Sequence, residues 1–189
     1  MDQFTNIDPR LNPTEDALWQ QRAGYPPEYP VNSTTLPLLY AEIEAISKSS
    51  GVSGYSVVIL GNRFGGAGIY FKRKTIGIGI EKLNSMNFPE LSSIISHEMG
   101  HAFRYLNTQS RPLGRPIIGL TALENEEVEA DRFSACLTGK LAAISALKSG
   151  GVAYNSQLSK QIRIDAIDQF DIGECPKVIS PKNGNKISL

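Results

Sequence analysis

Residues 87–103, NFPELSSIISHEMGHAF, form the stretch that decides how this chain is organised. Asn87 can accept a hydrogen bond from the free backbone N–H groups at a helix start, Pro89 fits the first helical turn, and Glu90 stands where a capping-box acid belongs. The residues that follow continue the helical pattern without a proline. We therefore expect one long helix over about residues 88–106.

The pattern before this helix predicts strands, and the pattern after it predicts further helices. Short β-branched or alternating runs predict strands at 55–60, 67–71 and 75–80. Periodic apolar residues predict other helices at 36–46, 121–148 and 157–170, besides a short one after Thr14. Strands followed by helices are typical of the α+β class, here a small twisted β-sheet packed on the long helix and on further C-terminal helices.

Three parts are expected along the chain. Five prolines among scattered aromatic residues set residues 1–35 apart as an extended N-terminal arm that wraps over the surface or, as the alternative, covers the site as a lid. A chain of 189 residues with 41% hydrophobic residues is long enough to build one core, so we expect a single folded domain over 36–172. Residues 173–189 are expected to be a C-terminal tail.

Composition argues against several classes of protein. The 19 Lys and Arg residues balance 19 Asp and Glu residues, whereas nucleic acid or an anionic membrane surface selects a basic excess. No run approaches the roughly 18 apolar residues of a membrane span. The first residues have neither a basic start nor an apolar segment, so we expect no secretory signal and a cytoplasmic location. Cys136 falls in a helical pattern and Cys175 in the C-terminal tail, and two thiols so placed do not make a disulfide framework, so both are expected to be reduced.

His97 and His101 are the only histidines in the chain, and they stand four residues apart on the expected long helix. One helical turn places their rings on the same face, where both can bind one metal ion. Glu98 points to one side of that face and is expected to act as the general base that takes a proton from a water on the metal. Two neutral nitrogen ligands beside a free carboxylate are the arrangement of a hydrolytic zinc.

A catalytic zinc needs a third protein ligand, and the acidic run at 124–131 offers one. Glu127 is the expected ligand because it lies on a stripe that should face inward, and a buried carboxylate needs a cation. Asp131 follows one turn later, where it can hydrogen-bond a ligand histidine. Glu126 is the alternative ligand. The stripe expected to face inward consists of Leu123, Ala130, Ser134, Leu137, Leu141 and Ile144.

The motifs His97-Glu98-Met99-Gly100-His101 and Glu127-Val128-Glu129-Ala130-Asp131 resemble those of the zinc endopeptidases that include the CaaX prenyl proteases and the HtpX-type heat-shock proteases. The resemblance extends over about residues 36–170. It implies a gluzincin-like fold, one Zn²⁺ per chain, and cleavage within a polypeptide that lies extended along the strand near residues 66–70. Only 25 residues separate His101 from Glu127, so the long insertion of many relatives is missing, and the chain is similar in size to compact gluzincins.

Relatives often carry a Ser-His-Pro stretch whose histidine stabilises the transition state, with an Arg-Ile pair six residues after that histidine. In this chain Gln157 replaces the histidine, while Arg163 and Ile164 keep the spacing. Gln157, Arg163 and Tyr154 are therefore the candidates that could donate to an oxyanion.

Three hypotheses follow. The first is a zinc-dependent metalloendopeptidase that hydrolyses peptide bonds of a polypeptide substrate with Glu98 as general base. The second is a non-catalytic regulatory module that holds zinc on the same fold, since the transition-state histidine is missing and an arm precedes the domain. The third is that both helices are purely structural and bind no metal.

Overall fold

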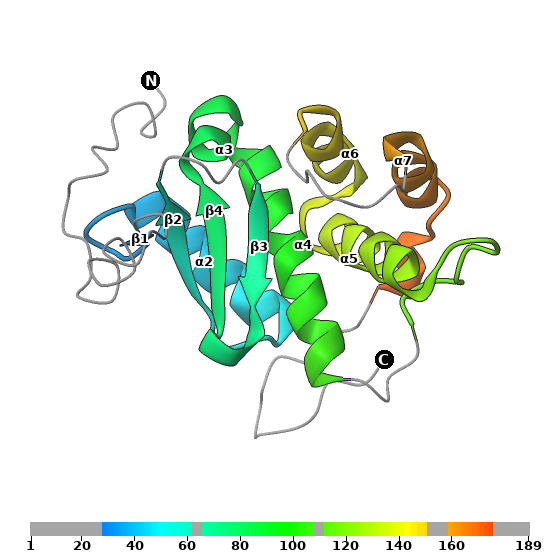
Figure 1. Ribbon diagram of the computed structural model, residues 1–189, viewed down its shortest axis with the longest axis horizontal. Coiled ribbons are helices and arrows are strands. Elements are labelled where there is room, and N and C mark those ends of the chain that lie inside the picture. Colours follow the sequence, from blue (N-terminus) through cyan, green and yellow to red (C-terminus); the bar gives the residue numbers. More distant parts are fainter. Residues whose placement is uncertain (1–27, 62–65, 108–111, 151–158, 176–189) are drawn as a thin grey trace.

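The computed structural model describes residues 28–61, 66–107, 112–150 and 159–175. In this part of the chain four strands form one mixed sheet in the order β1-β2-β4-β3 (Figure 1). The central strands β2 and β4 are parallel, and each edge strand pairs antiparallel with its neighbour. The strands are β1 (Glu28–Pro30), β2 (Ser56–Leu60), β3 (Ala67–Tyr70) and β4 (Thr75–Gly79). The α+β class with a small sheet is confirmed.

Most of the helices follow the sheet in sequence. They are α2 (Pro37–Ser50), α3 (Ile80–Ser85), α4 (Phe88–Leu106), α5 (Ala122–Thr138), α6 (Lys140–Lys148) and α7 (Lys160–Asp168), with short 3-10 turns η1 (Phe71–Arg73) and η2 (Ile172–Glu174). The expected long helix is α4. The single helix expected over 121–148 is wrong: Gly139 has a φ of 86°, a left-handed value that glycine tolerates, and it separates α5 from α6.

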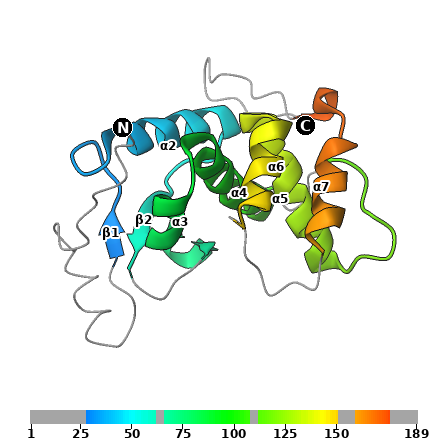
Figure 2. The ribbon, with the colours of Figure 1, turned by 90° about the horizontal axis from the view of Figure 1, so that it is seen from above.

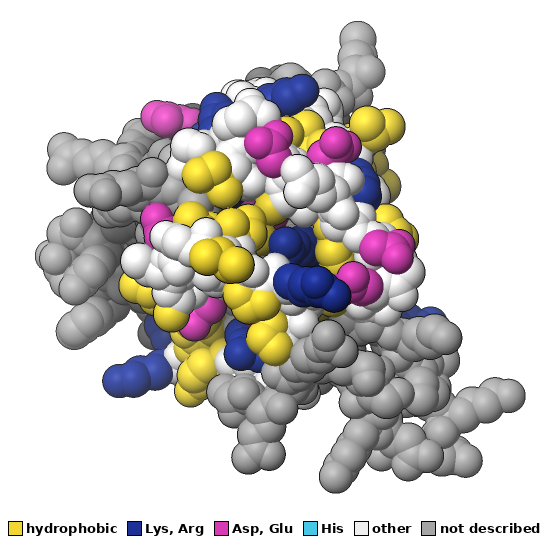
Figure 3. Space-filling model, turned by 90° about the vertical axis from the view of Figure 1, so that its right-hand side faces the viewer, with side chains coloured by type: hydrophobic (Ala, Val, Ile, Leu, Met, Phe, Trp, Pro, Cys, Tyr) yellow, Lys and Arg dark blue, Asp and Glu magenta, His cyan; other side chains and the backbone are white. Residues whose placement is uncertain are grey.

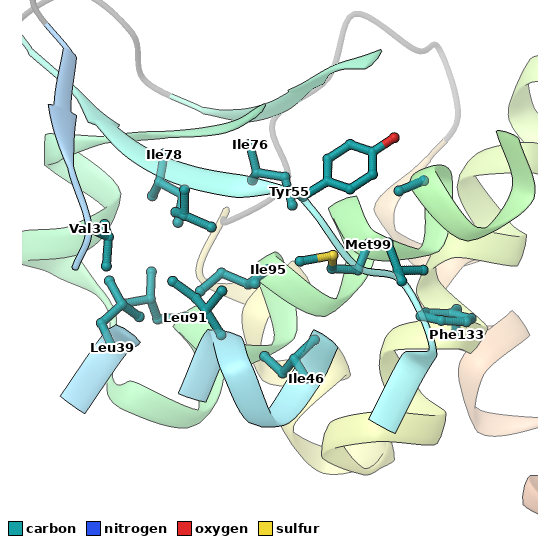
Figure 4. Close-up of a cluster of buried hydrophobic side chains, with 14 of the residues drawn as sticks. Val31, Leu39, Ile46, Tyr55, Ile76, Ile78, Leu91, Ile95, Met99 and Phe133 are labelled. Atoms are coloured by element: carbon teal, nitrogen blue, oxygen red, sulfur yellow. The ribbon is translucent and has the colours of Figure 1, made fainter. Parts of the chain in front are cut away.

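The main core lies between the sheet and the two helices α2 and α4, which cover one of its faces (Figures 1 and 2). Ile76 and Ile78 of β4 alternate with glycines, so both point to this face, as period-two alternation predicts. Leu39 and Ile46 of α2 meet them from the other side, together with Leu91, Ile95 and Met99 of α4 (Figure 4). This packing makes α4 the central helix of the domain.

The start of α4 has the predicted capping box. Asn87 Oδ1 accepts a hydrogen bond from Glu90 N at 3.0 Å, and Glu90 Oε2 accepts one from Asn87 N at 3.1 Å. The second oxygen of Glu90 accepts hydrogen bonds from Ser145 of α6 at 2.6 Å and from Ser149, the residue directly after α6, at 2.7 Å. The acid expected only to cap α4 therefore also ties it to α6.

The expected N-terminal arm and C-terminal tail lie mostly outside the described residues, as does the short helix expected after Thr14. The last part of the arm is described, and it is not a surface wrap: Glu28–Pro30 form β1, and Val31 is buried in the main core. A strand of three residues is too short to produce a periodic signal, so its pairing with β2 could not be recognised.

The inward stripe expected beyond Glu127 is only partly correct. Ala130 and Ser134 are buried, but Leu123 is 74% exposed and Leu141 is 85% exposed. Leu141 points outward because the break at Gly139 gives α6 a new direction. Leu123 lies in the first turn of α5, at the end remote from Ser134, and has little of the molecule packed on it.

The prediction of two reduced cysteines is wrong, because Cys136 and Cys175 form a disulfide. The residues are 39 apart in sequence, but α7 returns the chain to α5 and brings their Cα atoms to 5.6 Å. The bond joins the last part of α5 to the residue after η2. The cytoplasmic location stays a prediction, and a disulfide is more common in proteins outside the cytoplasm.

One face of the described surface agrees with the balanced composition. On the face shown in Figure 3, acidic and basic side chains are interspersed among apolar ones, and neither sign forms a continuous patch. Among the helices of the described part, none combines the length and the apolar composition needed to cross a membrane.

Candidate metal centre

His97, His101 and Glu127 are brought together at one point between α4 and α5. The Nε2 atoms of the two histidines lie 3.1 Å apart. Each Nε2 lies 3.4 Å from one oxygen of Glu127: Oε2 for His97 and Oε1 for His101. With metal–ligand bonds of about 2.0–2.1 Å, the corners of a tetrahedron are about 3.3 Å apart. The two nitrogens and the carboxylate of Glu127 are therefore close enough to bind one ion, and no fourth His, Cys, Asp or Glu side chain joins this cluster among the described residues.

Close packing of α4 on α5 sets these distances. Three contacts follow one another along the pair: Ser93–Ser134, His97–Asp131 and His101–Glu127. The residue numbers rise along α4 while they fall along α5, so the two helices are antiparallel. A methyl group on Gly100 would lie 3.0 Å from the Cα atom of Ala130, which is closer than side chains normally approach. Gly100 thus lets α5 approach the histidine face of α4.

Sequence reasoning missed the role of Gly100, although a signal was present. Glycine inside a helix costs about 1 kcal/mol relative to alanine, so a glycine in the middle of a long buried helix needs a packing reason. Here that reason is the backbone of α5.

Glu127 carries a charge that needs a cation. Burial raises the pKa of its carboxyl group, but the opposite effect of the two histidine rings beside it is larger. The pKa therefore lies well below the ordinary value, and the group is ionised. Within the described residues its buried Oε2 atom makes no hydrogen bond, but it forms ion pairs with His97 Nε2 at 3.4 Å and Arg163 Nη2 at 3.5 Å. A metal ion would give this oxygen a closer and more direct contact than these two ion pairs do.

Asp131 holds the ring of His97, as its position in the sequence predicted. His97 Nδ1–H donates to Asp131 Oδ1 at 2.9 Å, which leaves Nε2 facing the other ligands. Burial lowers the pKa of His97, but the bonds to Asp131 and Glu127 raise it to about 9. The metal-free ring is therefore protonated at neutral pH, and a metal must displace one proton from it.

Arg163, on α7, is one of the three candidate oxyanion donors, and its guanidinium group is bound to Asp131. Nε donates to Oδ2 and Nη2 donates to Oδ1, both at 2.6 Å, and both residues are buried. Burial raises the pKa of Asp131, and the hydrogen bonds from His97 and Arg163 lower it below the ordinary value. Three helices thus contribute to one chain of contacts: Arg163 to Asp131, and Asp131 to His97.

Glu98 is buried beside the three ligands and is not one of them. Burial raises the pKa of its carboxyl group, and the nearby rings of His97 and His101 offset part of that effect. A carboxylate with a raised pKa is a better proton acceptor at neutral pH, so the position and the environment of Glu98 suit a general base.

The remaining site predictions have different outcomes. Glu126, the alternative ligand, is exposed and stands outside the ligand cluster. Gln157 and Tyr154, the other two candidate oxyanion donors, lie outside the described residues.

Comparison of the chain with models of protein families, with curated proteins and with solved structures finds no match.

Proposed function

We propose that this protein is a zinc-dependent metalloendopeptidase of the gluzincin type, related to the CaaX prenyl proteases and the HtpX-type proteases. The observation that carries the proposal is that His97 Nε2 and His101 Nε2 lie 3.1 Å apart, each 3.4 Å from one of the two carboxylate oxygens of Glu127. Two imidazoles and one carboxylate with an open fourth position are the ligand set of catalytic zinc, whereas structural zinc sites are closed by four protein ligands.

When zinc is bound in such a site, it lowers the pKa of a water toward neutrality and polarises the carbonyl group of the scissile bond. Glu98 accepts the proton of the attacking water at a carboxylate oxygen and delivers it to the nitrogen of the leaving amine. Asp131 keeps His97 in the tautomer that presents Nε2, and Arg163 keeps Asp131 ionised and oriented.

The sheet offers a place for a polypeptide substrate. β3 is at the end of the described sheet order and lies beside α4, the helix that carries Glu98 (Figure 1). An extended peptide can pair with such an edge strand through main-chain hydrogen bonds, which accept most sequences. This arrangement supports cleavage within polypeptides, as the resemblance implies.

The test compares three variants loaded with Zn²⁺. Glu98→Gln should keep one zinc per chain, measured by elemental analysis, and lose peptide cleavage by at least a hundredfold, because general base catalysis supplies about 10²–10⁴. Glu127→Ala should lose both zinc and cleavage. Glu126→Ala, the exposed neighbour, should keep both. Cleavage retained by Glu98→Gln would exclude the mechanism.

A second candidate function, a zinc-binding regulatory module without turnover, is favoured by one observation. Arg163, the described candidate for the oxyanion donor, has two of its donor groups engaged with Asp131. Incubation of the zinc-loaded protein with a randomised peptide library distinguishes the two functions, because turnover of any peptide excludes the module. Zinc bound stoichiometrically without turnover would favour it.

A further inference from the structure

Two aromatic side chains lie together one helical turn beyond the candidate metal ligands. The rings of Tyr105, on α4, and Phe71, in η1, are stacked with centroids 4.6 Å apart and planes at 27°. Tyr105 is 58% exposed despite this contact. A stacked pair of large aromatic rings with this much exposure is available to contact a further apolar group.

The position of the pair relative to the site follows from helix geometry. His101 and Tyr105 are four residues apart on α4, so Tyr105 lies on nearly the same side of the helix as His101 and about 6 Å further along its axis. Phe71 comes directly after β3, which ends at Tyr70. The pair therefore bridges the end of the edge strand and the last turns of the helix that carries the histidines (Figure 1).

An extended peptide advances about 3.3 Å per residue, so about 6 Å corresponds to two residues. We propose that Tyr105 and Phe71 form an apolar subsite that receives an aromatic or large aliphatic side chain of the polypeptide substrate, two residues from the scissile bond. This inference rests on the proposed function. It adds a preference for certain substrate sequences, which neither the metal ligands nor Glu98 provide.

The neighbouring residue supplies a matched control. Leu106 is also large, apolar and exposed, at 53%, but it is turned about 100° from Tyr105 around the axis of α4. Its side chain therefore does not share the stack with Phe71. A general effect of removing exposed apolar area at this end of α4 should appear in both variants, whereas a subsite effect should appear only at Tyr105.

The experiment uses the full-length zinc-loaded protein and a dodecapeptide library randomised at every position, with the products sequenced by mass spectrometry. The wild type should show enrichment of aromatic and large aliphatic residues at one position two residues from the cleaved bond. Tyr105→Ala should lose that enrichment, and its kcat/KM for a preferred peptide should fall about tenfold. Tyr105→Phe, which keeps the stacked ring, and Leu106→Ala should both retain it.

A second measurement separates a subsite from a structural role. The Kd for a preferred peptide, measured by calorimetry on the Glu98→Gln background, should rise about tenfold with Tyr105→Ala, while zinc content and thermal stability stay unchanged. If Tyr105→Ala leaves the preference and the Kd unchanged, the subsite is overturned. If the wild type cleaves no peptide in the library, the proposed function itself has failed, and this result is distinct from cleavage without a preference at that position.

Discussion

Arg163 donates two hydrogen bonds of 2.6 Å to Asp131, the carboxylate that holds the ring of His97. Arg163 belongs to α7, Asp131 to α5 and His97 to α4, so this pair connects the candidate metal centre to the last long helix of the described chain. The guanidinium group also lies 3.5 Å from Oε2 of the ligand Glu127. Arg163 therefore lies where it can position the metal ligands His97 and Glu127.

Arg163→Gln should weaken zinc binding and destabilise the fold. Removing the guanidinium group leaves the buried Asp131 with His97 as its remaining charged partner, and breaking a buried ion pair in this way costs about 3–5 kcal/mol of unfolding free energy. Loss of a residue that orients metal ligands reduces metal affinity by about 10–100-fold. Chemical unfolding and competition with a zinc chelator measure the two effects. Gln161→Ala, an exposed change on the same helix, is the control and should alter neither quantity; equal zinc affinity in all three proteins would contradict the positioning role.

Gly100→Ala should separate α4 from α5. The added methyl group would lie 3.0 Å from the Cα atom of Ala130, a backbone position that cannot rotate away, so α5 must move. Overpacking of this kind costs about 1–3 kcal/mol, which exceeds the gain of about 1 kcal/mol in helix propensity. Zinc affinity should fall as well, because Glu127 moves with α5.

The control for Gly100 is Ser96→Ala, one turn earlier on the same buried helix. Ser96 Oγ is buried and makes no hydrogen bond in the described structure, so its removal should leave stability unchanged or slightly higher. Unfolding by urea with and without zinc compares the two variants. A Gly100→Ala protein as stable as the wild type and with its full zinc affinity would refute the close-contact argument.

Glu90 should make stability depend on acid pH. Burial raises the pKa of its carboxyl group, but the hydrogen bonds from Ser145, Ser149 and the backbone of Asn87 lower it below the ordinary value in the folded protein. A group whose pKa is lower when folded stabilises the protein above its unfolded pKa, and this contribution is lost as the pH falls through the folded pKa.

Glu90→Gln should therefore cost about 1.5–3 kcal/mol of unfolding free energy at pH 7, the range expected for hydrogen bonds to charged groups. The difference between wild type and variant should shrink as the pH falls below about 4.3, the ordinary pKa of glutamate. Urea unfolding at a series of pH values between 7 and 3 tests this, with the exposed Glu44→Gln as the control. A difference that stays constant across the series would count against the argument.

The disulfide between Cys136 and Cys175 should stabilise the fold. It closes a long loop that contains α6 and α7, and such bonds contribute about 2–4 kcal/mol by restricting the unfolded chain. Thiol titration of the unfolded, non-reduced protein should find no free cysteine, and reductant should lower the midpoint of thermal unfolding. The double variant with serine at both positions should be insensitive to reductant; free thiols in freshly purified protein would contradict the pairing.

Much of the local structure could be predicted from neighbouring residues. The capping residues Asn87 and Glu90 and the four-residue spacing of His97 and His101 act within one helix, where the period of 3.6 residues relates sequence position directly to direction. Glu127 and Asp131 could be selected for the same reason, because a carboxylate on a buried face and another one turn later have few other uses.

The contacts between distant parts of the chain were decided only by the tertiary structure. Asp131 is 34 residues from His97 and 32 residues from Arg163, and the disulfide joins residues 39 apart. Local periodicity states which face of a helix is buried, but not which other helix covers it or how closely. The approach at Gly100, the ion pair of Arg163 and the exposure of Leu123 depend on how α4, α5 and α7 pack together, and that packing depends on the shape of all their side chains at once.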